Sequence, residues 1–466
     1  MEVERGILET FSQSVGSSTA GVKLLLSVLI GYPIALIHRK YLYGKEANLQ
    51  HIYFLLSGLG LGFFNYGYDI SHPVLAVLVT YATVKLFDRS AVSVALTFIF
   101  NMTYLLMGYY YVGTDNYDIN WTMPQCIIVL RLIGLAFDLY DGRQPLESLS
   151  ADSKEVALQE IPPFLETLGF AFFPTSFLVG PQFPLKRYRE FVSGKYGQSP
   201  TTPPNSVQEA CKRLFLGIMF LSIFLILSQF TSDDYIMSQD FRNRNVFMRY
   251  FELGVWGRFT LYKYISCWLL TEGACILFGI THNGTDKFGT VKWNGVENVK
   301  VSVLENATQF NDYIHSFNIN TNSWVAHYIY KRLKFLGNRF YSQAISLIFL
   351  AVWHGFHSGY YMCFAFEFVV MYLERDVKRL INGNPVVLNF LQKPSVSIVV
   401  NILLRIYTFV FMGWCLLPFA LLTWERYCSV FGSVNYIGII FFCPYPFIYK
   451  IILRKLLKTN KSSHED

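Results

Sequence analysis

The chain of 466 residues is 53% hydrophobic and 17% aromatic, whereas only 15% of its residues are charged. An average soluble domain carries about 25% charged residues, so this composition excludes a soluble protein with a single anchor and indicates a polytopic membrane protein. The net charge of +7 is spread without a Lys/Arg cluster of the kind that binds nucleic acid, and it fits basic loops that face anionic lipid headgroups.

Apolar runs without Asp, Glu, Lys or Arg recur along the whole chain. They cover residues 24–38, 47–68, 70–84, 90–114, 167–185, 214–232, 340–366, 406–424 and 427–449. Shorter apolar pieces at 126–137, 264–279 and 396–404 are interrupted or flanked by charge. Runs of about 17–25 residues suit spanning helices, and shorter pieces suit re-entrant helices that protein shields from lipid. The sequence therefore predicts an all-α bundle of about eleven transmembrane helices with re-entrant and interfacial helices.

The distribution of Lys and Arg predicts the orientation of the chain. Three basic residues follow the first apolar run: Arg39, Lys40 and Lys45. The positive-inside rule places them in the cytosol, so residues 1–22 form a lumenal segment. Residues 451–466 are a basic tail that we also expect in the cytosol. No loop is long enough for a second core, so residues 1–466 are expected to form one membrane-embedded domain.

Two histidines lie within the run 340–366, which would span about 40 Å as one helix at roughly 1.5 Å per residue. His354 and His357 are three residues apart and would share one face of that helix. An imidazole inside a membrane is expensive and indicates a functional site. The sequence therefore marks this pair as candidate functional residues.

The histidine pair has three possible interpretations. A metal pair lacks ligands, because the run contains no carboxylate before Glu367. General-base catalysis fits better, since an apolar surround keeps imidazole neutral and able to accept a proton. Gly355 and Gly359 would let a helix or a substrate chain approach it closely. The alternative is a hydrogen bond within the helix bundle, which weighs more for His357 than for His354.

The segment 311–339 begins with closely spaced amides and then becomes apolar and basic. Asn318 and Asn322 belong to the amide-rich part, and Trp324 lies in the apolar-basic part. From Ser323 onward the apolar and basic residues follow a helical spacing, which predicts an amphipathic helix at the membrane interface. A surface helix with solvated lysines remains an equal alternative.

Several motifs in the same order resemble a known family. WHGFHSGYYMCF from Trp353 is similar to the signature of the membrane-bound O-acyltransferase superfamily. SFNINTNSWVAHYIYKRLKFLGN from Ser316, SFLVGPQF from Ser176 and LYKYISCWLLTEG from Leu261 resemble its lysophospholipid acyltransferase branch, closest to members that act on lysophosphatidylcholine. The resemblance extends over nearly the whole chain.

The resemblance implies a fold and an activity. Helices would surround a central chamber in which a long-chain, polyunsaturated acyl-CoA esterifies the sn-2 hydroxyl of a lysophospholipid during phospholipid remodelling. Lysophosphatidylcholine would be preferred, with lysophosphatidylethanolamine and lysophosphatidylserine accepted. Acyl-CoA would be a co-substrate, with no further cofactor and no metal. The family also implies the endoplasmic reticulum membrane, although the tail lacks a dilysine ending, and it is compatible with a homodimer.

The resemblance also assigns site residues. His354 would be the catalytic base and Asn318 its partner, which either orients the imidazole or donates to the developing oxyanion. Further residues are expected to contact substrate: Trp353, Gly355, His357, Gly359, Tyr360, Asn322, Trp324, Lys331, Arg332, Lys334, Gln182 and Glu272. The three basic residues among them are candidate contacts for the CoA phosphates.

Three rival functions remain open from the residues alone. Another acceptor is one, since other branches of the family use a sterol, diacylglycerol or a peptide. A transporter with a histidine proton relay is the second, and a catalytically silent lipid-binding protein is the third.

Overall fold

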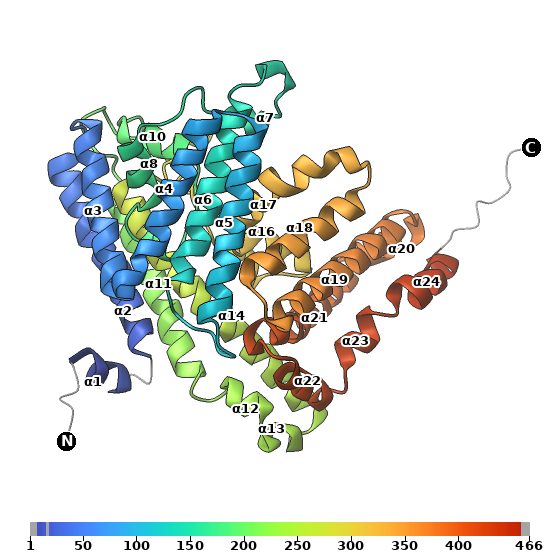
Figure 1. Ribbon diagram of the computed structural model, residues 1–466. Helices are drawn as coiled ribbons and strands as arrows, with labels where there is room; N and C mark the ends of the chain where they lie inside the picture. Colours follow the sequence, from blue (N-terminus) through green and yellow to red (C-terminus); the bar gives the residue numbers. More distant parts are fainter. Residues whose placement is uncertain (1–6, 15–17, 458–466) are drawn as a thin grey trace, which may run out of the picture.

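The computed structural model describes residues 7–14 and 18–457, and these residues fold almost entirely into helices (Figure 1). Within this part of the chain, the pairing outside helices that resembles β-structure is confined to three isolated bridges. The all-α prediction is confirmed. The expectations for the first six residues and for the tail beyond residue 457 lie outside the described residues.

Long helices form the body of the molecule. They are α2 (Thr19–Ile37), α3 (Ala47–Tyr66), α4 (Ser71–Phe87), α5 (Ala91–Val112), α6 (Thr122–Asp141), α11 (Val207–Leu227), α14 (Val246–Phe278), α18 (Arg339–His354), α19 (Ser358–Asn382) and α21 (Pro394–Leu421). Short helices connect and cap them: α1 (Ile7–Ser14), α7 (Ala151–Val156), α8 (Phe164–Ala171), α9 (Ser176–Val179), α10 (Leu185–Val192), α12 (Asp233–Met237), α13 (Gln239–Asn243), α15 (Val301–Glu305), α16 (Phe310–Ser316), α17 (Ile319–Val325), α20 (Pro385–Leu391), α22 (Trp424–Ser433), α23 (Ile437–Phe442) and α24 (Lys450–Leu457).

Seven helical segments of the described chain are long and apolar enough to cross a membrane, which makes this a multi-pass membrane protein. They are Thr19–Leu42, Ala47–Phe87, Ala91–Val112, Thr122–Asp141, Val207–Leu227, Pro394–Leu421 and Ile437–Leu456. The sequence pattern predicted about eleven. Part of the difference arises because the segment Ala47–Phe87 contains two helices, α3 and α4, which the sequence pattern counted separately. The difference also includes α14 and α19, which are long enough but carry several charged residues, and α18, which has only 16 residues.

Helix α14 joins the two sides of the molecule. In Figure 1 the helices α2 to α6 stand on one side and α18 to α24 on the other. α14 packs against α2, α11 and α21. At its crossing with α21 the backbones nearly touch, because a Cβ on Gly257 would lie 2.3 Å from the Cα of Gly413. Small residues permit such close helix contacts in membranes.

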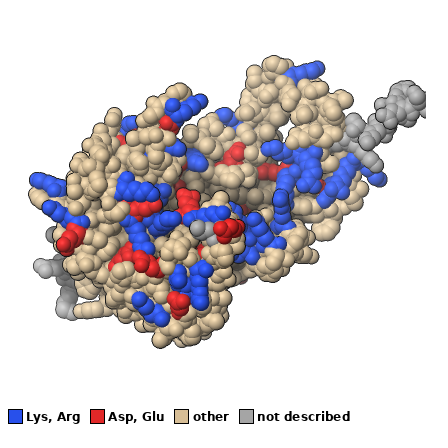
Figure 2. All heavy atoms as spheres, turned by 90° about the horizontal axis from the view of Figure 1, so that it is seen from above, with Lys and Arg blue, Asp and Glu red and all other residues tan. Residues whose placement is uncertain are grey.

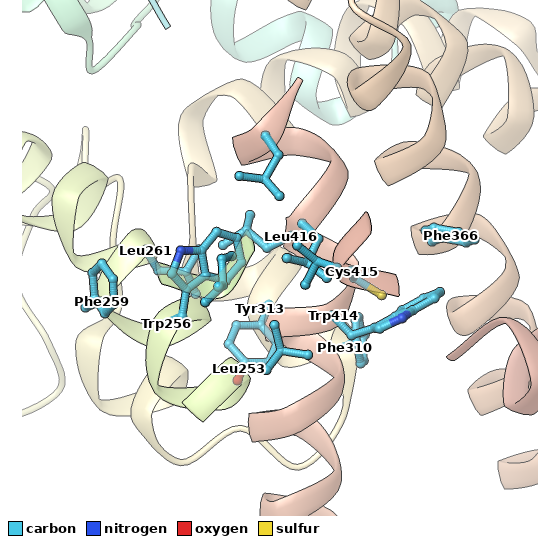
Figure 3. Close-up of a cluster of buried hydrophobic side chains, with 14 of the residues drawn as sticks. Leu253, Trp256, Phe259, Leu261, Phe310, Tyr313, Phe366, Trp414, Cys415 and Leu416 are labelled. Atoms are coloured by element: carbon cyan, nitrogen blue, oxygen red, sulfur yellow. The ribbon is translucent and has the colours of Figure 1, made fainter. Parts of the chain in front are cut away.

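A large apolar cluster fills the space around this crossing. Trp256 of α14, Trp414 of α21 and Phe366 of α19 pack into it, together with Phe310 and Tyr313 of α16 (Figure 3). Burial of aromatic side chains is the largest source of packing energy per residue in such a cluster. The cluster therefore fixes α14, α19 and α21 relative to one another.

The apolar run 340–366 is two helices and not one. α18 ends at His354, and α19 begins at Ser358. Gly355 between them has a φ of 126°, a conformation that residues with a Cβ rarely adopt. The prediction that His354 and His357 share one face of a single helix is therefore wrong, because the glycine redirects the chain directly after His354.

The segment 319–336 is helical throughout, which confirms the helix predicted from Ser323 onward. α17 continues into a π-helix, Ala326–Tyr330, and a 3₁₀-helix, Lys331–Leu336. Trp324 and Tyr328 are buried, whereas Lys334 is exposed. Figure 2 looks onto the end of the molecule where α7 and α10 lie, and many Lys and Arg side chains gather on that face.

Candidate active site

A cavity of about 1440 Å³ lies inside the helix bundle. Residues that are far apart in the sequence meet at its wall, and seven of those marked by the sequence are among them: Gln182, Asn318, Trp353, His354, Gly355, His357 and Tyr360. The cavity therefore brings the proposed base and its proposed partner to one chamber.

His354 is the last residue of α18 and is held by aromatic rings. Its ring centroid lies 5.0 Å from that of Phe419, 5.3 Å from Tyr360 and 5.6 Å from Phe364. Its imidazole makes no hydrogen bond with any residue that the structure describes, while it lines the cavity. Both ring nitrogens are thus available to a substrate, and the apolar surround favours the neutral form, which can accept a proton.

The end of α18 is fixed through the residue before His354. The indole Nε1 of Trp353 donates to the carbonyl of Cys126 at 3.1 Å, and the Tyr109 hydroxyl donates to the carbonyl of Trp353 at 3.1 Å. A Cβ on Gly355 would lie 3.5 Å from the Tyr109 ring, in addition to the strain of its positive φ. Helices α5 and α6 therefore determine where the imidazole lies.

Asn318 lies in a tight polar loop between α16 and α17. Its φ of 49° is in the left-handed region, which Asn tolerates better than most residues. The Nδ2 of Asn298 donates to the Oδ1 of Asn318 at 3.4 Å. Asn298 also accepts the backbone N–H of Ile319 on its carbonyl at 3.1 Å and that of Asn320 on its Oδ1 at 3.0 Å.

Two more amides hold the same loop. Asn320 donates through Nδ2 to the carbonyls of Val296 and Glu297 at 3.0 and 2.9 Å. Asn322 donates through Nδ2 to the carbonyls of Ile314 and Phe317 at 3.0 Å each. Asn322, marked from the sequence, is therefore a structural support of the loop and does not line the cavity.

Glu272 of α14 anchors the strand-like stretch that faces this loop. Its Oε1 accepts the backbone N–H of Asn298 at 2.5 Å and that of Val299 at 3.1 Å. Arg213 balances its charge, at 3.6 Å from Glu272 and 2.7 Å from Glu297. Glu272 is 2% exposed, so it acts by positioning Asn298 and not by touching the cavity.

A line of rings connects the loop to the histidine. The ring of Phe317 lies 6.4 Å from that of Tyr264, and Tyr264 lies 6.4 Å from Phe419. Phe419 in turn contacts His354 at 5.0 Å. Aromatic side chains therefore lie between Asn318 and His354.

Gln182 adds an unsatisfied polar atom to the chamber. It lines the cavity and is 8% exposed, and its Oε1 has no hydrogen-bond partner among the described residues. A buried acceptor without a partner is rare. Gln182 therefore carries a buried acceptor beside the chamber that no described residue satisfies.

The remaining marked residues lie outside the lining of the cavity. A Cβ on Gly359 would lie 1.9 Å from the carbonyl oxygen of Pro418, so this glycine allows α19 to approach α21. Trp324 is buried and donates to the carbonyl of Leu130 at 2.9 Å. Lys331 pairs with Asp152. Gly359 and Trp324 therefore serve the packing of the bundle, whereas Lys331 forms an ion pair at the surface.

Arg332 and Lys334 differ in whether a carboxylate neutralises their charge. Arg332 makes two hydrogen bonds with Asp141, at 2.7 and 2.5 Å, and Asp141 is 1% exposed. Lys334 is exposed, and its side chain has no ion-pair or hydrogen-bond partner in the described part of the chain. Lys334 is therefore the freer of the two cations.

The sequence patterns did not mark Asn298 and Arg213, which hold the loop of Asn318, or Lys263 of the cavity wall. The first two are polar residues distant from any motif. A signal existed for the third, because Lys263 stands between two tyrosines at the edge of an apolar stretch.

Known proteins are similar to this chain over most of its length. Residues 106–417, which contain both His354 and Asn318, match the sequence profile of MBOAT, the membrane-bound O-acyltransferase family. Lysophospholipid acyltransferase 5 of Mus musculus is 41% identical over 463 residues, covering 98% of this chain and 95% of that protein. The Homo sapiens protein of that name is 41% identical over 458 residues (97% and 94%), and that of Drosophila melanogaster 42% over 443 residues (94% and 88%).

Proposed function

Because the chain belongs to the membrane-bound O-acyltransferase family, we propose that it transfers an acyl group from acyl-CoA to the free hydroxyl of a lysophospholipid. The family predicted from the motif around Trp353 is confirmed by this membership. The observation that carries the function is the near full-length identity to proteins named lysophospholipid acyltransferase 5. The shared cavity of His354 and Asn318 supports it.

In the proposed reaction His354 is the general base. Its imidazole takes the proton of the sn-2 hydroxyl while the oxygen attacks the thioester carbonyl, and the tetrahedral intermediate then releases CoA, whose sulfur takes up the proton. A positioned base of this kind contributes about 10²–10⁴-fold in rate. The aromatic surround excludes water, which would otherwise hydrolyse the thioester.

Asn318 is proposed to stabilise the oxyanion. Its Oδ1 already accepts from Asn298, whereas its Nδ2 donates to no described residue. An amide held by its oxygen presents its N–H groups in a fixed direction, which is what a preorganised oxyanion donor requires. This geometry favours the oxyanion role over the orientation of the imidazole.

The two substrates are proposed to enter from different sides. The anionic CoA would approach from the basic face, where α7 lies, and Asp152 of α7 pairs with Lys331. Lys331, Arg332 and Lys334 are the candidate contacts for its phosphates. The lipid chain would lie along the apolar part of the cavity wall, which includes Leu24 of α2 and Leu221 of α11. Lysophosphatidylcholine as the preferred acceptor, and a polyunsaturated acyl-CoA as the donor, belong to this proposal.

The proposal extends to the membrane. One domain, residues 1–466, would lie in the endoplasmic reticulum membrane with a lumenal N-terminus and a cytosolic C-terminus. The seven candidate segments, of which Ala47–Phe87 contains both α3 and α4, belong to this domain. Beyond them, α14, α18 and α19 would contribute further membrane elements toward a bundle of about eleven around the chamber. The homodimer stays a prediction.

One assay tests the function. The purified protein in nanodiscs is given an acyl-CoA together with lysophosphatidylcholine, cholesterol, diacylglycerol or an acceptor peptide, and the release of free thiol is followed. We expect thiol release that depends on the lysophospholipid. Release with another acceptor alone would move the chain to a different branch of the family. A pH-driven ion flux without thiol release would support the transporter alternative instead.

A further inference from the structure

Lys263 is the only Lys or Arg among the described residues that line the cavity. It lies halfway along the 33-residue helix α14. Its Nζ stands 5.1 Å from the ring centroid of Tyr117 and 5.0 Å from that of Tyr264. It forms no ion pair or side-chain hydrogen bond with any residue that the structure describes.

The unpaired ammonium of Lys263, in the middle of α14, indicates a binding site for an anionic ligand. A cation away from water is expensive unless it is paired, and charged residues inside membrane proteins mark substrate pathways. Two tyrosine faces offset part of this cost through cation–π contacts. Neither ring accepts a conventional hydrogen bond, so the protons of Lys263 have no acceptor among the described residues. An anion inside the cavity would supply one.

Two carboxylates line the same cavity. Asp115 and Asp118 belong to the loop that follows α5, and neither forms an ion pair in the described part of the chain. Arg426 holds this loop, donating to the carbonyl of Asp115 at 2.6 Å and to the Oδ1 of Asn116 at 3.2 Å. The ring that faces Lys263 comes from the same loop, at Tyr117. The wall of the chamber therefore carries one cation beside the Tyr117 ring and, on the exposed loop of that tyrosine, two anions.

We propose that this arrangement is the headgroup site of a zwitterionic lysophospholipid. Lys263 binds the phosphate, and the loop residues Asp115, Tyr117 and Asp118 receive the cationic end of the headgroup. Aromatic rings and carboxylates are the groups that recognise quaternary ammonium ions. The inference rests on the function proposed above and adds the residues that select its acceptor.

The position of Lys263 relative to the base suits this role. Its Nζ lies over the ring of Tyr264, whose neighbour Phe419 contacts His354. In a lysophospholipid the phosphate and the free hydroxyl are carried by adjacent carbons of the glycerol. A cation that fixes the phosphate therefore also fixes the direction from which the hydroxyl meets the imidazole, which lowers the entropic barrier to reaction.

CoA also carries phosphates, and it is the other source of an anion for Lys263. The two carboxylates argue against it, because they would repel a polyanion and attract an ammonium group. The experiment below separates the two sources by measuring the KM of each substrate.

The test uses the full-length protein in nanodiscs and the thiol-release assay with two acceptors, lysophosphatidylcholine and lysophosphatidic acid, which lacks the cationic group. For Lys263→Met we expect the KM for lysophosphatidylcholine to rise about 10- to 100-fold, as loss of a charged hydrogen bond implies, while the KM for acyl-CoA stays the same. Lys263→Arg should recover most of the affinity. Lys287→Met is the matched control, because Lys287 also lies over a ring, that of Phe288 at 5.0 Å, but outside the cavity lining.

A second variant tests the other half of the site without altering Lys263. The double change Asp115→Asn with Asp118→Asn should lower the preference for lysophosphatidylcholine over lysophosphatidic acid by about twofold to fivefold, the size expected for exposed charges. Thermal melting of each variant identifies those that fold.

Three outcomes would overturn the proposal. A rise in the KM for acyl-CoA with an unchanged acceptor KM would assign the cation to CoA. Unchanged KM values for both substrates in folded Lys263→Met and in the double Asn variant would make these residues structural. Wild-type protein without lysophospholipid-dependent thiol release would refute the proposed function itself, a result separate from the other two.

Discussion

The two sides of the candidate site are built in opposite ways. Asn318 is held by a network of amide hydrogen bonds from Asn298, Asn320 and Asn322, anchored by a buried carboxylate. His354 is held by rings and by the end of its helix, with no polar partner among the described residues. Hydrogen bonds fix a direction, whereas packing leaves the two ring nitrogens available. The first construction suits a fixed donor and the second a base that must gain and lose a proton.

The largest expected effect comes from removing the imidazole of His354, which tests its role as the base. We expect His354→Ala to lower kcat by about 10²–10⁴-fold, because the change removes the proposed general base from the cavity wall. Thiol release under saturating substrates measures the loss. His315→Ala is the control, since His315 is exposed on α16. A folded His354→Ala protein with normal activity would contradict the assignment of the base.

The two possible roles of the amide are separated by an isosteric change. Asn318→Asp keeps the oxygen that accepts from Asn298 and removes the N–H donor. We expect a loss of about 10²–10³-fold in kcat, as for removal of an oxyanion donor elsewhere, with an unchanged melting temperature. Asn318→Ala should lose as much activity and in addition melt earlier, because alanine tolerates the φ of 49° less well. Full activity of Asn318→Asp would refute the oxyanion role.

Glu272 anchors the amide network, so we expect its substitution to lower both the stability of the protein and kcat. Glu272→Gln replaces the charged acceptor of two backbone N–H groups and weakens its pairing with Arg213. We expect the free energy of unfolding to fall by about 1.5–3 kcal/mol, and kcat to fall with it as the loop shifts.

The control for this change is Glu209→Gln, which breaks an exposed pair with Lys212 at 3.0 Å. Such surface pairs contribute about 0–1 kcal/mol. Denaturant titration of both variants compares the two effects. Equal stabilities would show that Glu272 does not support the loop.

The comparison also explains what the sequence could predict. The membrane class, the all-α fold and the family followed from apolar runs and from motifs, because these are local patterns. The break of the run 340–366 could not be read from the residues, since a glycine inside an apolar stretch is compatible with a continued helix. It becomes decisive only when Tyr109 and Trp353 fix the end of α18.

The supports of the site were harder to predict than its reacting groups. His354 and Asn318 carry motifs, but Asn298 and Arg213 act through contacts that tertiary structure creates between distant segments. The partners of the basic residues in segment 319–336 were also hard to predict. The spacing of that segment correctly predicted a helix, but it could not show that Arg332 pairs with Asp141 and Lys331 with Asp152.

The smallest expected effect concerns these basic residues, and it compares Arg332, which is paired with Asp141, with Lys334, which has no partner among the described residues. Lys334→Ala should raise the KM for acyl-CoA by about twofold to fivefold, since exposed charge contacts contribute about 0.2–1 kcal/mol. The effect should shrink as salt is added, because the charge is screened. Arg332→Ala should instead lower stability, as it leaves the carboxylate of Asp141 buried without its partner. If the KM of Lys334→Ala for acyl-CoA equalled that of wild type at every salt concentration, the CoA phosphates would bind elsewhere on the basic face.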